Sequence, residues 1–187
     1  MKKIPTIFKR NQENMKELLN EPHPDCDWVF KGEGTATRKY DGTCCLVKEG
    51  KLYKRREIKK GKPIPEEFEM ADHDEVTGKT VGWMPVTDSA EDVWHREAFT
   101  GKELDGTYEL CGPKIQKNPE NFHIHVIFSR SHVLISHNTA QIFPSVERTF
   151  DGIKTFLAGV DTEGIVFHHP DGRMAKIKKR DYGQTRT

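Results

Sequence analysis

Short runs of alternating apolar and polar residues dominate the chain, and this pattern predicts strands. The runs expected to form strands are residues 43–47, 51–55, 107–111, 123–128, 132–137, 164–168 and 173–178. Helical spacing of apolar residues is less common. Residues 11–20 can form a short helix, and residues 146–157 place apolar side chains three and four positions apart. Many short strands with few helices predict an antiparallel α+β fold.

Two tight turns are indicated by their residues. Residues 48–51 (Lys-Glu-Gly-Lys) and 169–172 (His-Pro-Asp-Gly) can each reverse the chain between two strands. In the second hairpin, the period of two along a strand puts Lys176 and Lys178 on the same face. Glu163 precedes the first strand of this hairpin, so an acid and two lysines are expected in one neighbourhood.

Length and composition predict one compact domain over residues 1–187, because the chain is 34% hydrophobic and 32% charged. Its 10 Phe, 4 Tyr and 3 Trp residues are too many for a disordered chain. No run approaches the ~18 consecutive apolar residues that span a bilayer, and no hydrophobic signal core follows Met1. We therefore expect a cytoplasmic protein with no membrane partner. Residues 61–80, which contain two prolines and many acids, are expected to be a loop-rich insertion.

Cysteine and histidine do not indicate a disulfide framework or a zinc site. The cysteines Cys26, Cys44, Cys45 and Cys111 show no Cys-x-x-Cys spacing, so reduced and mostly buried thiols are expected. Nine histidines occur without the Cys or carboxylate spacing of a dedicated zinc site, which favours surface or hydrogen-bonded histidines.

The net charge of +1 conceals strong segregation of charge. A basic stripe contains Lys51, Lys54, Arg55, Arg56, Lys59, Lys60 and Lys62, and a second group contains Lys176, Lys178, Lys179 and Arg180. An acidic segment follows the first stripe and contains Glu66, Glu67, Glu69, Asp72, Asp74 and Glu75. A polyanionic partner is compatible with this pattern, and two solvated charged faces are the alternative.

Four segments with candidate chemistry follow one another along the chain: Lys39-Tyr-Asp-Gly, Tyr108-Glu-Leu, Glu163-Gly-Ile-Val and Lys176-Ile-Lys. Each has an ordinary structural interpretation when taken alone. Asp-Gly before a strand is a common turn, Glu163 could be a hairpin residue, and the lysines could line a solvated face. Their order along the chain is more informative than any one of them.

In this order the segments resemble the covalent nucleotidyltransferase superfamily of ATP-dependent DNA and RNA ligases and mRNA capping enzymes. Its ordered motifs are Lys-x-Asp-Gly, an Arg-bearing strand, a Glu-bearing strand, Glu-Gly and Lys-x-Lys. The stretch Gly112-Pro-Lys-Ile-Gln-Lys-Asn is similar to RNA ligases. Further segments are similar to the small ATP-dependent RNA ligase family that includes the vertebrate 5′–3′ RNA ligase: Lys39-Tyr-Asp-Gly-Thr-Cys-Cys, Gly82-Trp-Met-Pro-Val, Val93-Trp-His, His132-Val-Leu-Ile-Ser-His and Glu163-Gly-Ile-Val-Phe-His. The resemblance covers about residues 35–183 and implies an ATP-grasp-like ligase adenylylation domain.

The resemblance implies a catalytic role for three lysines. Lys39 would be the nucleophile that holds AMP, and Lys176 and Lys178 would grip the α-phosphate and orient the leaving pyrophosphate. A free lysine has a pKa of ~10.4, so fewer than ~1 in 1,000 are neutral and nucleophilic near pH 7. Neighbouring cations disfavour the ammonium form and also stabilise charge on the transferring phosphate. Glu163 would position Mg²⁺ through water, and Mn²⁺ could take its place.

Four further positions are implied to contact the nucleotide or its surroundings. Asp41 would support the site, and Glu109 would hold the ribose hydroxyls. Arg55 would contact the nucleotide sugar or the 5′-phosphate of RNA, and Val166 would cover one face of adenine. The side chain on the second face is left open between Ile135 and Phe128.

The implied activity is an ATP-dependent RNA ligase that joins 5′-phosphate and 3′-hydroxyl ends through lysyl-AMP and adenylylated RNA. The basic stripe would follow the RNA backbone, no appended RNA-binding domain is expected, and a monomer is expected. Two alternatives remain, an RNA-capping guanylyltransferase and a catalytically inactive nucleotide- or RNA-binding protein. One departure from the pattern is Thr43-Cys44-Cys45, where many ligases place an arginine.

Overall fold

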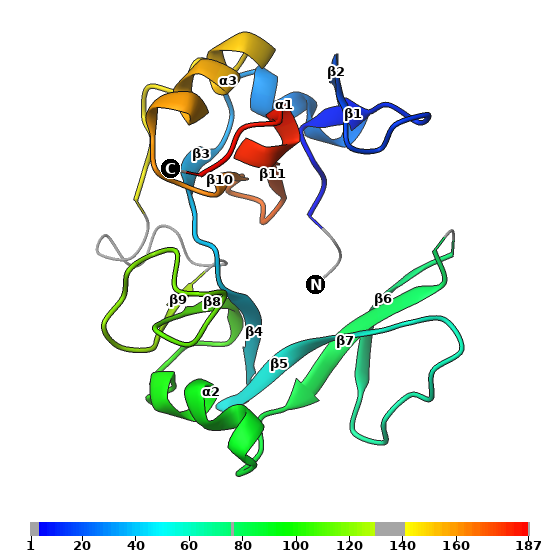
Figure 1. Ribbon diagram of the computed structural model, residues 1–187, viewed down its shortest axis with the longest axis vertical. Coiled ribbons are helices and arrows are strands. Elements are labelled where there is room, and N and C mark those ends of the chain that lie inside the picture. Colours follow the sequence, from blue (N-terminus) through cyan, green and yellow to red (C-terminus); the bar gives the residue numbers. More distant parts are fainter. Residues whose placement is uncertain (1–3, 76, 130–140, 187) are drawn as a thin grey trace. The chain divides into compact units, whose positions relative to one another are not determined.

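The computed structural model describes residues 4–75, 77–129 and 141–186 (Figure 1). The fold is α+β, with mostly antiparallel sheets and few helices, as the sequence predicts. The chain divides into two compact units. Residues 41–129 belong to the six-stranded unit, and residues 4–40 and 141–186 form the three-stranded unit. One nucleotidyltransferase domain over residues 1–187 stays a prediction.

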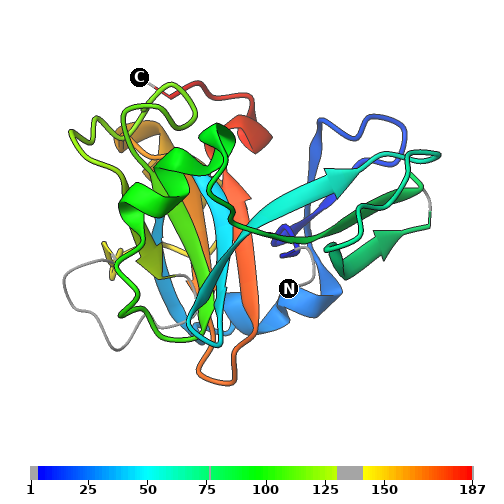
Figure 2. The ribbon, with the colours of Figure 1, turned by 90° about the horizontal axis from the view of Figure 1, so that it is seen from below.

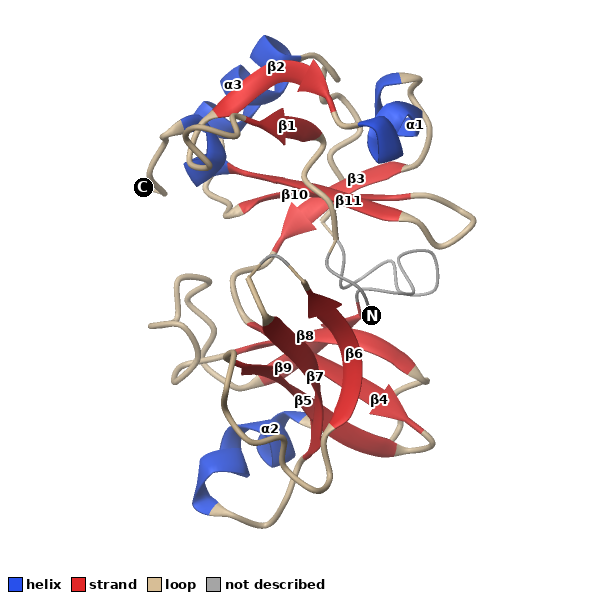
Figure 3. Cartoon of the chain, turned by 90° about the vertical axis from the view of Figure 1, so that its right-hand side faces the viewer, coloured by secondary structure: helices blue, strands red, loops and turns tan. Residues whose placement is uncertain are grey.

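The six-stranded unit is a single antiparallel sheet with the strand order β6-β7-β5-β4-β8-β9 (Figure 3). Its strands are β4 (Thr43–Lys48), β5 (Lys51–Ile58), β6 (Glu69–Asp74), β7 (Lys79–Pro85), β8 (Gly106–Cys111) and β9 (Val126–Ser129). A 3-10 helix, η2 (Ala90–Asp92), and helix α2 (Val93–Ala98) follow β7. Alternating apolar residues of β4, β5 and β8 form the buried core of this unit.

The three-stranded unit is built from both ends of the described chain. Its elements are β1 (Phe8–Arg10), β2 (Leu18–Pro22), η1 (Pro24–Cys26), α1 (Asp27–Phe30), β3 (Thr35–Lys39), α3 (Phe150–Gly159), β10 (Gly164–His168), β11 (Met174–Lys178) and η3 (Lys179–Tyr182). The strands β11, β10 and β3 pair antiparallel in that order, and β1 and β2 pair with each other. The hairpin of β10 and β11 is orange in Figure 2.

The sheet of the three-stranded unit has an apolar face and a polar face. On the apolar face, Ile165 and Phe167 of β10 belong to a buried cluster that also contains Ile153 and Leu157 of α3. Side chains alternate between faces along each strand, so residues 164, 166, 176 and 178 lie on the face opposite this core. The core therefore determines which face carries the lysines.

Both predicted hairpin turns are confirmed. Glu49 and Gly50 have φ of 52° and 70°, the left-handed pair that a two-residue hairpin turn requires. Gly172 N donates to His169 O at 3.0 Å and closes the turn between β10 and β11.

Six of the seven predicted strands coincide with observed strands, although the strand predicted at 123–128 begins only at Val126. The strand predicted at 132–137 lies outside the described residues.

The helix predicted over residues 11–20 is wrong, because this segment forms turns and then enters β2. The Asn11 side chain donates to the Glu17 carboxylate at 2.9 Å, and the Asn14 side chain accepts from Lys16 N at 3.3 Å. Asparagine side chains that bond to nearby groups compete with helical hydrogen bonds and favour turns.

Two other predictions need correction. The helix predicted over 146–157 begins later, as α3, because the Thr149 hydroxyl accepts from Gly152 N at 3.0 Å and caps the helix there. The segment 61–80 is not only a loop, because it contains β6 and the start of β7. These strands form since β6 pairs with β7, which in turn pairs with β5.

The thiol prediction is confirmed, since Cys26, Cys45 and Cys111 are buried and the four cysteines, all within the described residues, form no disulfide. Across the described ranges, the helices are too short or too polar to cross a membrane.

Gly164 provides a test of the sheet packing, because a Cβ at this position would lie 2.1 Å from the Ile177 carbonyl oxygen. We expect Gly164→Ala to lower the free energy of unfolding by about 2–3 kcal/mol, the upper part of the range for overpacking. Urea denaturation followed by circular dichroism measures this change. The matched control is Gly159→Ala at the end of α3, where nothing lies within 4 Å of the new Cβ. Equal effects of the two substitutions would contradict the close approach.

Candidate functional site

One charge cluster of the three-stranded unit consists of Lys39, Glu163 and Lys178. One oxygen of the Glu163 carboxylate accepts from Lys39 Nζ, and the other accepts from Lys178 Nζ. The side chains are only 11%, 13% and 17% exposed, respectively. One carboxylate therefore bridges two lysines that are largely removed from water.

The strand register explains why these residues meet. Gly164 of β10 lies opposite Lys39 of β3 on one side and opposite Lys178 of β11 on the other. Residues directly opposite in a sheet share a face, so the two lysines flank a position that has no side chain. Glu163 immediately precedes this glycine, and its carboxylate lies between the two amines.

Two other predicted residues share this face. Val166 lies opposite Thr37 on β3 and opposite Lys176 on β11, and it is 6% exposed. The backbone of Lys176 is held by the N-terminal segment, since Lys176 N donates to Pro5 O at 2.9 Å and its carbonyl accepts from Ile7 N at 3.0 Å. The structure therefore gathers Lys39, Val166, Lys176 and Lys178 on one face, with Glu163 between two of the lysines.

The charge of Glu163 is set by two opposing effects. Burial raises the pKa of this carboxyl, because the charged form loses its water. The attraction of Lys39 and Lys178, with their hydrogen bonds, outweighs burial, and the pKa lies below its ordinary value of 4.5. The carboxylate is therefore charged near neutral pH.

Lys178 is also positioned through its backbone by residues that the sequence analysis missed. Lys178 N donates to Asp181 Oδ2 at 2.9 Å, and Arg10 Nη2 donates to Asp181 Oδ1 at 2.6 Å. Asp181 had a local signal, because an acid three residues after a helix N-cap is a capping pattern. Arg10 had none, because 171 positions separate it from Asp181 in the sequence.

Thr162, the residue before Glu163, was also missed. Its hydroxyl is fully buried and lies 3.4 Å from Lys39 O and 3.0 Å from Gly164 O. This contact fixes the backbone on both sides of Glu163 and ties it to the end of β3. A single buried threonine has no sequence signal that separates it from core packing.

The other three predicted residues belong to the six-stranded unit. Asp41 N donates to Glu120 Oε1 at 3.0 Å. The Arg55 guanidinium on β5 lies 5.8 Å from the centre of the Trp83 ring. Glu109 is buried on β8, which pairs with β4 and β9. Their implied nucleotide contacts stay predictions.

The side chain expected on the second face of adenine, Phe128 or Ile135, stays a prediction. The ring of Phe128, on β9, lies 5.2 Å from that of Phe122, which gives it a packing role. Ile135 is outside the described residues.

The residues present fit magnesium only in a restricted way. Within the described ranges, no three His, Cys, Asp or Glu side chains are grouped to hold a metal ion. Mg²⁺ is commonly held by one or two carboxylates together with substrate phosphates and water, rather than by a protein cage. Glu163 is the carboxylate of the lysine cluster that could contribute in this manner.

The chain matches no model of a known protein family and no curated protein. The interpretation of the site therefore depends on the order of the motifs and on the geometry around Glu163.

Glu163→Gln is expected to destabilise the fold in a pH-dependent manner. Removing one member of a buried ion pair costs ~3–5 kcal/mol, and we expect about 2–3 kcal/mol here because the lysines keep some contact with water. The folded carboxyl has the lower pKa, so its stabilisation is complete above pH 4.5 and is lost as the pH falls through the folded value. The difference between parent and variant should therefore be constant near pH 7 and shrink below pH 4.5.

Denaturant unfolding at several pH values measures this difference. Glu13→Gln, which neutralises an exposed glutamate, is the control and should change stability little. A difference for Glu163→Gln that does not depend on pH would show that the two ion pairs do not stabilise the fold.

Proposed function

We propose that this chain is an ATP-dependent RNA ligase in which Lys39 carries AMP as a covalent intermediate. The observation that carries the proposal is the Glu163 carboxylate shared by Lys39 and Lys178, with Lys176 on the same face of the sheet. The order of motifs, which resembles covalent nucleotidyltransferases, agrees with this geometry. ATP, Mg²⁺ and RNA ends are the proposed ligands.

The cluster has the components of a nucleotidyl-transfer site. Transfer needs a nucleophilic amine close to cations that hold the reacting phosphate. Lys39 and Lys178 are separated by a single carboxylate. The phosphates of ATP carry the same sign of charge as Glu163, so they can replace it as the partner of Lys178 and bring the α-phosphorus to Lys39.

The first step would join Lys39 Nζ to the α-phosphorus and break the bond from that phosphorus to the oxygen of the β-phosphate. Pyrophosphate leaves, and the proton of the amine passes to solvent. Lys176 and Lys178 stabilise the negative charge on the transferring group. Magnesium, when bound with the nucleotide, neutralises further phosphate charge.

This face also carries the apolar residue that is proposed to pack against the nucleotide base. Val166 is apolar and lies between Thr37 and Lys176 in the register, two positions along β10 from the glycine that faces Lys39. An adenine packed on Val166 would have its phosphates directed along the sheet toward the lysines.

Two further transfers complete the proposed reaction. AMP moves from Lys39 to the 5′-phosphate of RNA, and a 3′-hydroxyl then attacks that phosphate and displaces AMP. Each transfer exchanges one bond at phosphorus for another, so the same cations can stabilise all three.

Intact-mass spectrometry tests the covalent step. After incubation with ATP and Mg²⁺, the parent is expected to gain the mass of one AMP, and Lys39→Ala is expected to gain none. Lys178→Ala should slow labelling by at least ~100-fold, the usual effect of removing one group that stabilises transition-state charge. Lys154→Ala, which removes an exposed lysine of α3, is the matched control and should label like the parent.

Labelling with GTP and joining of DNA ends distinguish the proposed RNA ligase from the alternative functions. Labelling from GTP alone would identify a capping guanylyltransferase. A folded parent that forms no adduct with either nucleotide would favour a nucleotide- or RNA-binding protein without catalysis. Joining of DNA ends in preference to RNA ends would overturn the proposed substrate.

A further inference from the structure

Within the described residues, the cations of the basic stripe of residues 51–62 differ in whether they form an ion pair or stack on an aromatic ring. Lys54 forms an ion pair with Asp92 at 2.5 Å, and Arg55 stacks on Trp83. In contrast, Lys59, Lys60 and Lys62 form no ion pair with any carboxylate in the described part of the chain. These three exposed lysines follow directly after β5.

The three lysines are concentrated by a turn. Lys62 N donates to Lys59 O at 3.1 Å, and Gly61 between them has a φ of 77°. A left-handed φ is readily adopted by glycine, so this turn can be tight. Three like charges within four residues repel one another, and a bound anion would relieve that repulsion.

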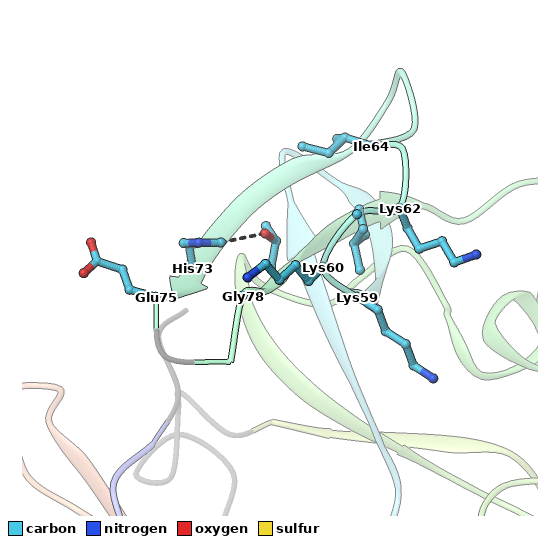
Figure 4. Close-up of a pocket in the computed structure, with 10 residues that line it drawn as sticks. Lys59, Lys60, Lys62, Ile64, His73, Glu75 and Gly78 are labelled. Carbon is cyan, nitrogen blue, oxygen red and sulfur yellow. Dashed lines mark hydrogen bonds between the residues drawn. The ribbon is translucent and has the colours of Figure 1, made fainter.

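These lysines line a cavity of about 430 Å³ in the six-stranded unit. Its opposite wall comes from β6 and β7, where the His73 ring and the Thr80 hydroxyl lie 2.8 Å apart (Figure 4). The volume is within the ordinary range for ligand sites. Glu75 is the one acidic side chain of the lining, so the lysines outnumber the acid three to one.

The aliphatic part of the Lys60 side chain packs against Gly78. A Cβ at Gly78 would lie 2.8 Å from Lys60 Cδ, so the absence of a side chain lets the stem cross the turn between β6 and β7. Figure 4 shows Lys60 extending toward the His73 side of the turn, while Lys59 and Lys62 extend the other way. The ammonium groups therefore fan out around the turn and do not converge on one point.

We propose that this lysine turn binds the phosphate backbone of RNA. A fan of separate cations suits successive phosphates along a polymer, whereas a compact anion would need converging groups. The choice of a phosphate polymer rests on the turn itself, and the choice of RNA rests on the proposed ligase function. Exposed cations around a cavity, rather than an enclosed pocket, also leave a chain free to continue on both sides.

Fluorescence anisotropy with a labelled single-stranded RNA measures this binding. The RNA carries a 5′-hydroxyl, so it cannot be adenylylated and binding is separated from ligation. The triple variant Lys59→Gln, Lys60→Gln, Lys62→Gln should bind roughly tenfold more weakly at low salt. The slope of log affinity against log salt should fall by about 2, because each lost contact to a single strand contributes ~0.7.

A matched triple variant controls for net charge. Lys16→Gln, Lys102→Gln, Lys154→Gln removes three exposed lysines elsewhere and should leave the affinity within about twofold of the parent. Equal weakening by the two triple variants would overturn the proposal, because it would show only a general charge effect. An unchanged affinity of the first variant would also overturn it.

Glu75→Gln tests the same surface in the opposite direction. It removes the acid of the lining and should strengthen RNA binding severalfold. The control Glu91→Gln removes an exposed acid after β7 and should not strengthen binding.

Competition with inorganic tripolyphosphate tests whether the turn prefers a small anion. If it displaced RNA at a lower phosphate concentration than unlabelled RNA does, the turn would be a small-anion site and the proposal would be wrong.

The two proposals can fail separately. The lysine-turn variant keeps every residue of the Lys39 cluster, so its labelling with ATP should equal that of the parent. Loss of RNA binding by the lysine-turn variant, with normal labelling by ATP, supports the RNA surface. Absence of labelling in the parent contradicts the ligase function, and the RNA-binding measurement then tests the lysine turn by itself.

Discussion

The sheet of the three-stranded unit depends on one carboxylate held between two amines. Glu163 accepts from Lys39, 124 positions earlier in the chain, and from Lys178, 15 positions later. All three side chains are largely buried, so each charge needs the others to compensate for lost water. The two ion pairs join the ends of β3 and β11 beside β10 and give the polar face its pattern of charge.

The cluster is held by its surroundings as well as by its own attraction. Thr162 ties the start of β10 to the end of β3, and Asp181 holds the backbone of Lys178 while it accepts from Arg10. On the reverse face, Ile165 and Ile177 are packed in the core with α3. Side chains that are positioned before a substrate binds lose little freedom on reaction, which would favour the proposed nucleotidyl transfer.

Lysines have two different environments in this protein. Some of those on the strands form ion pairs, as Lys54 does with Asp92 and Lys48 with Glu69. Lys59, Lys60 and Lys62, in the turn after β5, form no ion pair in the described residues, although an acidic segment follows at residues 66–75. The same residue type therefore serves to hold the sheet in one place and to offer uncompensated charge in the other.

The sequence by itself determined the two hairpins and the common face of Lys176 and Lys178, because turn residues and strand alternation act over a few neighbouring positions. The local spacing of residues predicted a helix over residues 11–20, which is wrong because asparagine side chains there bond to nearby groups. Only the tertiary structure decided that Lys39 and Lys178 share Glu163, and that Arg10 supports Asp181. These contacts join distant segments through sheet register, and register is set by how a whole core packs, which no short stretch of sequence contains.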